Sequence, residues 1–252
     1  MGVVKMEKEI KLIALDMDGT LVNHDGDVSK ENEDAVKRAK EQGIHVVLST
    51  GRSLPFCRDI AEQLGHSAYL VTVNGGQIFD KELNLVDSTH LTNDLVKRLW
   101  DLKVKHDVYF WSSTTEGVFN TKKPFEKEID DYNWLKFGFD IQDDNIRKVI
   151  TDEVMANEAL EVTNSSPTNL EINPAGVNKA AALMKVCNWL DLSMDNVMAV
   201  GDSMNDIAMI REAGFGVAMG NAQERVKEAA NWITKDYTEH GVAHAIDRVL
   251  KK

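Results

Sequence analysis

Three short apolar runs in this chain each end in a polar segment of an unusual kind. The segments are "DMDGT" at residues 16–20, "STGR" at residues 49–52 and "GDSMND" at residues 201–206. The first places Asp16 and Asp18 one residue apart. Carboxylates that are held close together repel one another, and burying them without a partner is costly. The segments therefore predict a divalent cation, and Mg²⁺ suits them because it favours a few carboxylates together with water and phosphate oxygens.

Phosphoryl transfer is the chemistry that such residues would perform. Asp16, at the end of its apolar run, is well placed to attack phosphorus and form an aspartyl-phosphate, which divides one difficult transfer into two easier steps. Asp18 would protonate the leaving oxygen and then take a proton from the attacking water. The transferred group also needs donors around its equatorial oxygens. The candidates are the Thr50 hydroxyl and the backbone N–H groups of Gly51 and Met17.

A positive charge close to the phosphate is needed as well, and Lys179 is the candidate. It stands in "GVNKAAAL" at residues 176–183, where a helical pattern begins. Most lysines are solvated surface groups, so this assignment depends on the three polar segments described above. Arg52 and Asn74 are candidates for substrate contact, although a salt bridge and a capping side chain are equally good interpretations of them.

Strand-like and helical patterns alternate at both ends of the chain. Helical patterns begin after Ser29 and end at Gly43 and Gly65, residue types that favour helix boundaries. This alternation predicts a doubly wound, mostly parallel α/β sheet. Such sheets bind ligands beyond the carboxyl ends of their strands, where the three polar segments stand. The expected strands are residues 11–15, 44–48, 69–73, 196–200, 215–219 and 231–234.

The middle of the chain has a different character and carries most of the aromatic residues. Helical patterns at residues 93–106 and 143–155 are interspersed with strand-like runs such as "VYFW" and "YNWLKFGF". This pattern is typical of an α+β unit with an antiparallel sheet. We therefore predict a core formed by residues 1–83 and 177–252, interrupted by an inserted domain at residues 84–176.

Composition limits the partners that the chain would bind. The 252 residues include 29 Lys and Arg against 41 Asp and Glu, a net charge of −12, which disfavours nucleic acid and anionic membranes. A small anionic substrate is still compatible, because one metal ion and a local cation can reverse the sign of a single cleft. No apolar run approaches the roughly 18 residues of a membrane span. The first ten residues lack the apolar centre of a signal peptide, so we expect a cytoplasmic protein.

The cysteines and histidines form no pattern that is typical of catalysis. Cys57 and Cys187 match neither a zinc spacing nor a disulfide framework, and we interpret them as small half-buried side chains. His240 and His244 stand four residues apart, but without an HExxH context a solvated helix face is the better interpretation.

The order of "DMDGT", "STGR", "NK" and "GDSMND" resembles the haloacid dehalogenase superfamily of phosphohydrolases. Within it, the chain looks like the Cof-type branch, subfamily IIB with a C2 cap. Supporting segments are "VNGG" at residues 73–76, "LEINPAGVNKAAAL" at residues 170–183 and "VAMGNA" at residues 217–222. The resemblance extends over nearly the whole chain and implies a Rossmann-like core whose inserted domain is a cap that closes over the site.

The resemblance also implies a role for each residue of the polar segments. Asp16 would be the nucleophile and a Mg²⁺ ligand, and Asp18 the general acid and base, with its backbone carbonyl on the metal. Asp202 would be the remaining direct ligand, and Asp206 would act through water or by orienting its neighbours. The implied phosphate contacts are Thr50, Gly51, Lys179 and Asn205.

These residues favour a Mg²⁺-dependent phosphatase acting on a small phosphorylated metabolite, such as a sugar phosphate. The resemblance adds a phosphorylated flavin-pathway intermediate to the candidates, since relatives in this branch act there. A phosphomutase with the same intermediate is one alternative. A phospho-accepting protein without turnover is another, but Asp18 argues against it because a switch gains nothing from an adjacent general acid. We expect a monomer or a small homo-oligomer.

Overall fold

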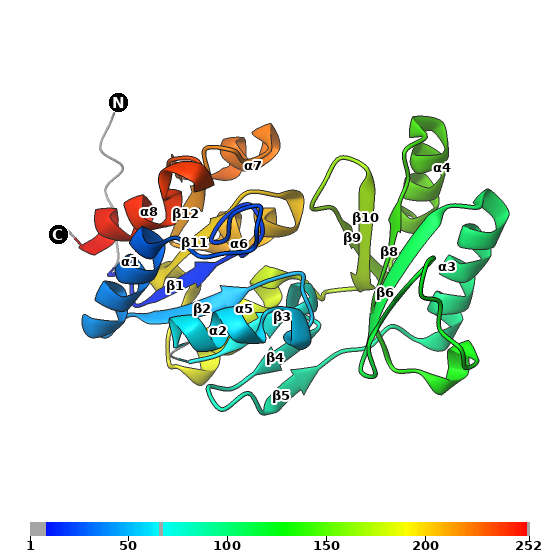
Figure 1. Ribbon diagram of the computed structural model, residues 1–252, viewed down its shortest axis with the longest axis horizontal. Helices are drawn as coiled ribbons and strands as arrows, with labels where there is room; N and C mark the ends of the chain where they lie inside the picture. The colour runs from blue at the N-terminus through cyan, green and yellow to red at the C-terminus, as the bar shows by residue number, and fades with distance from the viewer. Residues whose placement is uncertain (1–8, 66–67, 251–252) are drawn as a thin grey trace.

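Two sheets organise the chain, as seen in a computed structural model that describes residues 9–65 and 68–250. The opening segment used above to assess a signal peptide lies largely outside these residues. Figure 1 shows the two resulting units side by side, with the first and last parts of the chain in one unit and the middle in the other.

The larger unit is built on an eight-stranded sheet, which confirms the expected α/β fold. The strands from β13 to β3 run parallel, and β4 and β5 are added antiparallel at one edge. In spatial order the strands are β13 (Trp232–Ile233), β12 (Phe215–Ala218), β11 (Val197–Gly201), β1 (Leu12–Leu15), β2 (His45–Ser49), β3 (Leu70–Thr72), β4 (Gln77–Phe79) and β5 (Leu85–Ser88).

Strand β1 lies at the centre of this sheet, and its register decides where the site forms. Leu15, its last residue, is paired with Val200 of β11 on one side and with Leu48 of β2 on the other. The three strands therefore end at the same level. The polar segments that follow them meet at one edge of the sheet, as expected for parallel strands.

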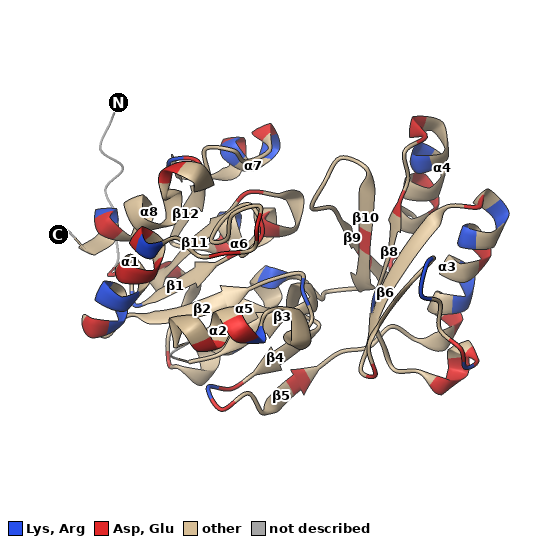
Figure 2. Cartoon of the chain, viewed as in Figure 1, with Lys and Arg blue, Asp and Glu red and all other residues tan. Residues whose placement is uncertain are grey.

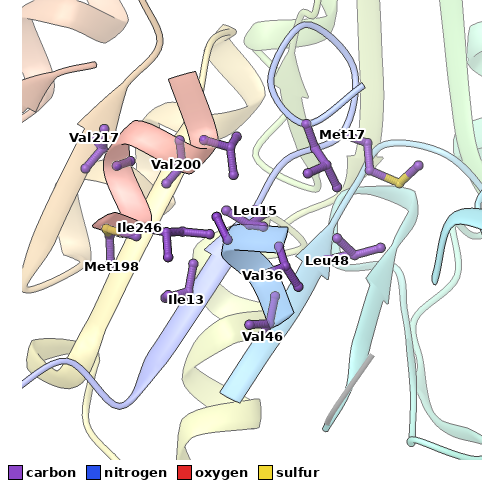
Figure 3. Packing of buried hydrophobic residues seen from close by; sticks show 14 of the residues in the cluster. Ile13, Leu15, Met17, Val36, Val46, Leu48, Met198, Val200, Val217 and Ile246 are labelled. Carbon is purple, nitrogen blue, oxygen red and sulfur yellow. The ribbon is translucent and has the colours of Figure 1, made fainter. Parts of the chain in front are cut away.

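Helices cover both faces of the large sheet. Ile13 and Leu15 of β1 pack with Val36 and Ile246 on one face, as Figure 3 shows, whereas Leu12 and Ala14 face the other. All four residues of β1 are buried, as is typical of a parallel strand covered on both sides. The helices are α1 (Lys30–Glu41), α2 (Arg58–Leu64), α5 (Lys179–Trp189), α6 (Ile207–Glu212), α7 (Glu224–Ala229) and α8 (Gly241–Leu250).

Local signals account for the ends of these helices. The Ser29 side chain accepts a hydrogen bond from the backbone of Asn32 and caps α1, as predicted. The helical pattern that ends at Gly65 is not one continuous helix, because Leu54–Phe56 forms a 3₁₀ turn and Cys57 then adopts a non-helical backbone before α2 begins. His240 contacts Ser29 and His244 contacts Thr234, so the two histidines have different partners.

The smaller unit is an antiparallel five-stranded sheet with helices on one face. Figure 1 shows α3 (Asn93–His106) and α4 (Asp144–Met155) on the side away from the large sheet, and Figure 2 shows that both helices carry charges of both signs. The strands, in spatial order, are β7 (Val118–Asn120), β6 (Tyr109–Thr114), β8 (Trp134–Asp140), β10 (Asn169–Pro174) and β9 (Leu160–Thr163).

Alternation along the strands gives the small sheet two different faces. Phe137 and Phe139 of β8 point into an aromatic core beneath the helices, together with Ile172 of β10. Their neighbours Lys136 and Glu171 must then point the other way, because successive side chains of a strand alternate between faces. The second face is polar and is turned toward the large unit.

The chain passes between the two units twice, once between β5 and α3 and once between β10 and α5. The expected boundary at residue 84 stands just before β5, which pairs with β4 in the large sheet. None of the described helices combines the length and apolar character needed to cross a bilayer.

Candidate active site

The turn after β1 begins the site. The backbone N–H of Asp16 still donates to Val200 of β11, and the carbonyl of the fully buried Met17 then accepts three N–H groups, which wraps the chain into a tight turn. Gly19 in this turn has φ = +77°, and a Cβ atom there would lie 2.7 Å from Oδ2 of Asp202. Only glycine therefore lets the turn approach the end of β11 so closely.

Three carboxylates gather where β1 and β11 end. One oxygen from each of Asp16, Asp202 and Asp206 lies within 4.8 Å of the others. The ammonium of Lys179, at the first turn of α5, lies 2.6 Å from Oδ1 of Asp16 and 2.7 Å from Oδ1 of Asp206. Lys179 is fully buried. When ionised, the three acids thus exceed this one cation by two charges.

The cluster holds too little positive charge to balance its three carboxylates. Burial raises the pKa of Asp16 well above its usual value, the Asp206 carboxylate adds to the rise, and Lys179 offsets only part of it. Burial and Asp206 likewise raise the pKa of Asp202 to about 7. A divalent cation would relieve both effects, and an all-oxygen carboxylate set suits Mg²⁺. The residues present therefore fit that ion.

Asp206 and two hydroxyls orient the acids. Oδ2 of Asp206 accepts hydrogen bonds from the backbone N–H groups of Asp202 and Ser203, at 2.9 and 3.0 Å. The hydroxyls of Thr20 and Ser203 donate to the two carboxylate oxygens of Asp202. Asp206 thus holds the loop that presents Asp202. Neither hydroxyl was among the predicted site residues, although both belong to the segments quoted above.

Asp18 stands apart from the cluster. Its carboxylate is exposed and accepts two hydrogen bonds from Arg52, at 2.9 Å to Nε and 2.5 Å to Nη2. Arg52 also donates to the carbonyl of Phe56. The structure therefore pairs Asp18 with Arg52 in a salt bridge, which was one of the alternatives to a substrate contact for this arginine.

The segment after β3 connects the remaining candidates. The backbone N–H of Asn74 donates to the carbonyl of Thr50, and Oδ1 of Asn74 accepts from Asn205 at 3.3 Å. Val73 and Asn74 have φ values of +54° and +59°. This left-handed backbone is rare for a β-branched residue such as valine, and strain of this kind gathers at functional sites.

Side chains of the small unit reach this segment. Lys136 of β8 donates to the carbonyl of Gly51 at 2.7 Å and forms an ion pair with Glu171 at 3.1 Å. Glu171 also accepts hydrogen bonds from Asn74 and from the Ser165 hydroxyl. Sequence reasoning missed this pair, although a lysine inside the apolar run "WLKFGF" was a usable signal. A buried, fully partnered charge pair thus joins the two units.

A cavity of about 340 Å³ lies between the units, over the acidic cluster. Met17, Thr50, Asn74, Lys179 and Asp206 are buried and are not part of its wall. A second cavity, of about 480 Å³, lies within the small unit and is lined by none of the candidate residues. The wall of the first cavity consists of Asp16, Asp18, Gly51, Arg52, Trp111, Lys136, Ser165, Asn169, Glu171, Asp202, Ser203 and Asn205.

The Glu171 carboxylate should make stability depend on pH. Burial alone would raise its pKa, but the Lys136 charge and the hydrogen bonds from Ser165, Asn74 and Lys136 lower it to about 2, against 4.5 for a free glutamate. Because the folded value is the lower one, the carboxylate stabilises the fold above pH 4.5. This contribution, of about 3 kcal/mol, is lost as the pH falls from 4.5 toward 2.

Glu171→Gln should therefore unfold more easily than the wild type at pH 6, and its free energy of unfolding should fall less steeply between pH 4.5 and 2. Denaturant titrations at several pH values measure both effects. Glu158→Gln, at an exposed position of the same unit, is the matched control and should behave as the wild type. Equal pH slopes for Glu171→Gln and the wild type would contradict the assignment.

Comparison with known proteins extends over nearly the whole chain. Residues 13–246 match the family described as haloacid dehalogenase-like hydrolase. A protein of Bacillus subtilis (strain 168), named 5-amino-6-(5-phospho-D-ribitylamino)uracil phosphatase YcsE, is 52% identical over 246 residues and matches 98% of each chain.

Two solved structures share the fold. A haloacid dehalogenase-like hydrolase from B. subtilis superposes with a TM-score of 0.87 at 26% identity, over 94% of this chain and 99% of the other. A structure described as the HAD subclass IIB sugar phosphatase BT4131 superposes with a TM-score of 0.81 at 22% identity, over 94% and 98% of the two chains.

Proposed function

The chain belongs to the haloacid dehalogenase-like hydrolases, as a phosphatase of the Cof type, and we propose that it hydrolyses a small phosphorylated metabolite using Mg²⁺ and an aspartyl-phosphate intermediate. The observation that carries this proposal is the meeting of Asp16, Asp202 and Asp206 around Lys179, beside a cavity between two units. In this proposal the cluster supplies the nucleophile, Asp16, and a cation, Lys179, and its carboxylates need further positive charge.

In this proposal the chemistry is divided between two aspartates. Asp16 attacks phosphorus, the bond to the leaving oxygen breaks, and Asp18 gives that oxygen a proton. Asp18 then takes a proton from water, which attacks the aspartyl-phosphate and frees Asp16. The two hydrogen bonds from Arg52 would hold the Asp18 carboxyl group in one orientation for both proton transfers.

The other residues hold the phosphate and the ion. Asp16, Asp202 and the backbone carbonyl of Asp18 would hold Mg²⁺, with Asp206 acting through its neighbours. When bound, the ion supplies positive charge that offsets the repulsion between Asp16 and the phosphate. We assign the phosphate contacts to the Thr50 hydroxyl, the backbone N–H groups of Met17 and Gly51, and the side chains of Lys179 and Asn205.

We propose 5-amino-6-(5-phospho-D-ribitylamino)uracil as the substrate. The support is the 52% identity to a phosphatase of that name along 98% of this chain. A cavity of about 340 Å³ is at the low end of the roughly 300–1,000 Å³ that small-molecule sites occupy, which fits a metabolite better than a phosphorylated macromolecule. The inserted unit, expected at about residues 84–176 and beginning after β5 in the structure, would be the cap that excludes water and selects the substrate.

The test is phosphate release from a panel of metabolites with Mg²⁺ present. The ribitylaminouracil phosphate should have the highest kcat/KM, ahead of hexose, erythrose and pyridoxal phosphates. Turnover should need no bisphosphate activator, which separates a phosphatase from a phosphomutase. If phosphate is released from no member of the panel, the proposal is contradicted.

Removing the metal should abolish activity without unfolding the protein. With excess EDTA, phosphate release should fall by at least about 100-fold, because the acids would repel the incoming phosphate. Adding Mg²⁺ beyond the chelator should restore the rate. Circular dichroism in EDTA should match that of the metal-loaded protein, since the hydrophobic clusters do not depend on the ion. A rate that persists in EDTA would contradict the metal assignment.

A further inference from the structure

The wall of the cavity contains an aromatic side chain that no step of the proposed chemistry uses. Trp111 lies on β6, on the polar face of the small sheet. Most of the other large aromatic residues of this unit, such as Phe110, Phe137 and Phe139, pack beneath the helices on the opposite face. Within residues 9–65 and 68–250, Trp111 is the only aromatic residue that lines the cavity.

The backbone of β8 supports the Trp111 ring closely. Trp111 is paired with Gly138 across the two strands. A Cβ atom at position 138 would lie 2.2 Å from Cζ2 and 2.3 Å from Cε2 of the indole. The indole therefore packs directly against the backbone of Gly138, in a space that the side chain of any larger residue at position 138 would fill. One side of the indole is fixed in this way, and the side chain as a whole stays partly exposed.

Neighbouring polar side chains hold one another. Lys136 is bonded to the Gly51 carbonyl and to Glu171, and its ammonium lies 4.8 Å from the centre of the Trp111 ring, a cation–π contact that further fixes the indole. The Ser165 hydroxyl donates to Glu171 and accepts from the Asn169 side chain. These polar groups are bonded to one another, and the partly exposed Trp111 side chain is the aromatic group that this part of the wall offers a ligand.

We propose that Trp111 is a specificity-determining residue, on which a planar conjugated ring carried by the leaving alcohol of the substrate stacks. The inference deepens the proposed function and rests on it. It predicts that the enzyme prefers phosphate esters with such a ring to ring-free polyol phosphates. Stacking of a heterocycle on an aromatic side chain accounts for a preference of roughly 10- to 100-fold.

The test compares two esters that share the phosphoribityl chain. One is 5-amino-6-(5-phospho-D-ribitylamino)uracil, and the other is ribitol 5-phosphate, which has no ring. Trp111→Leu should lower kcat/KM for the first by about 10- to 100-fold, mainly through KM, and should change the value for the second by less than about twofold. Trp111→Phe keeps an aromatic surface and should recover most of the loss.

Trp189→Leu is the matched control, because Trp189 is partly exposed at the end of α5, within the large unit. It should leave kcat/KM unchanged for both esters. Equal losses on both esters in Trp111→Leu, or no loss on either, would overturn the inference.

The two proposals fail in different ways. If the wild type hydrolyses both esters with equal kcat/KM, the ring is not recognised and the inference fails, while the proposed function stands. If the wild type releases phosphate from neither ester nor from p-nitrophenyl phosphate, both are overturned.

Discussion

Asp16→Asn should eliminate phosphate release almost completely, by roughly 10⁴-fold or more, the scale of loss when a covalent nucleophile is removed. The amide that replaces the carboxylate is a poor nucleophile and carries no charge for a metal ion. Initial rates with the ribitylaminouracil phosphate and Mg²⁺ measure the effect. Because asparagine has nearly the shape of aspartate, the ends of β1 and β11 should keep their positions.

Two controls separate loss of chemistry from loss of fold. Asp101→Asn, at an exposed position of α3, should retain wild-type rates. The unfolding temperature of Asp16→Asn should equal or exceed that of the wild type without metal, because one of three mutually repelling carboxylates is gone while Asp206 still accompanies Lys179. Retention of more than a tenth of the activity in Asp16→Asn would contradict its role as nucleophile.

Lys179→Met should reduce both activity and stability. The ammonium is fully buried between Asp16 and Asp206, and methionine fills similar space without the charge. Removing one partner of a buried ion pair costs about 3–5 kcal/mol, because the remaining charge is left without compensation. Activity should fall by roughly 10³-fold, since the phosphate and the nucleophile lose the same cation.

Thermal unfolding of Lys179→Met with EDTA and with Mg²⁺ provides a second measurement. The variant should be stabilised by Mg²⁺ more than the wild type is, because the ion would supply the charge that the lysine no longer provides. Lys185→Met is the matched control on the same helix. Its ammonium is half exposed and pairs with Asp87, so its loss should cost about 1 kcal/mol or less. Equal stability of the two variants would contradict the role of Lys179.

The parts of this structure that follow local rules could be predicted from the sequence. The parallel strands β1, β2 and β11 were predicted to within one residue at each end, because apolar runs bounded by turn residues specify such strands. Since parallel strands end together, the convergence of the polar segments at one edge followed from their order along the chain.

Contacts between the two units could not be predicted in the same way. The pairing of Lys136 with the Gly51 carbonyl joins residues 85 positions apart, and it depends on how the small sheet is oriented against the large one. Alternation in β8 predicts that Lys136 lies on the other face of the sheet from Phe137, but it does not predict which residues that face contacts. The ion pair of Asp18 with Arg52 could not be predicted either. The rotamer of the Arg52 side chain decides between this ion pair and a substrate contact, and the sequence pattern does not specify that rotamer.

The double passage of the chain between the units has a consequence for recombination. A segment that leaves after β5 and returns before α5 can be exchanged as a cassette, and it carries Lys136, Glu171 and Trp111 with it. Asn74 and Gly51 stay behind in the recipient. In a chimaera, the exchanged segment would therefore pack against the large unit only where donor and recipient both preserve these hydrogen bonds. Exchange of substrate specificity by recombination is then restricted to pairs of chains that share them.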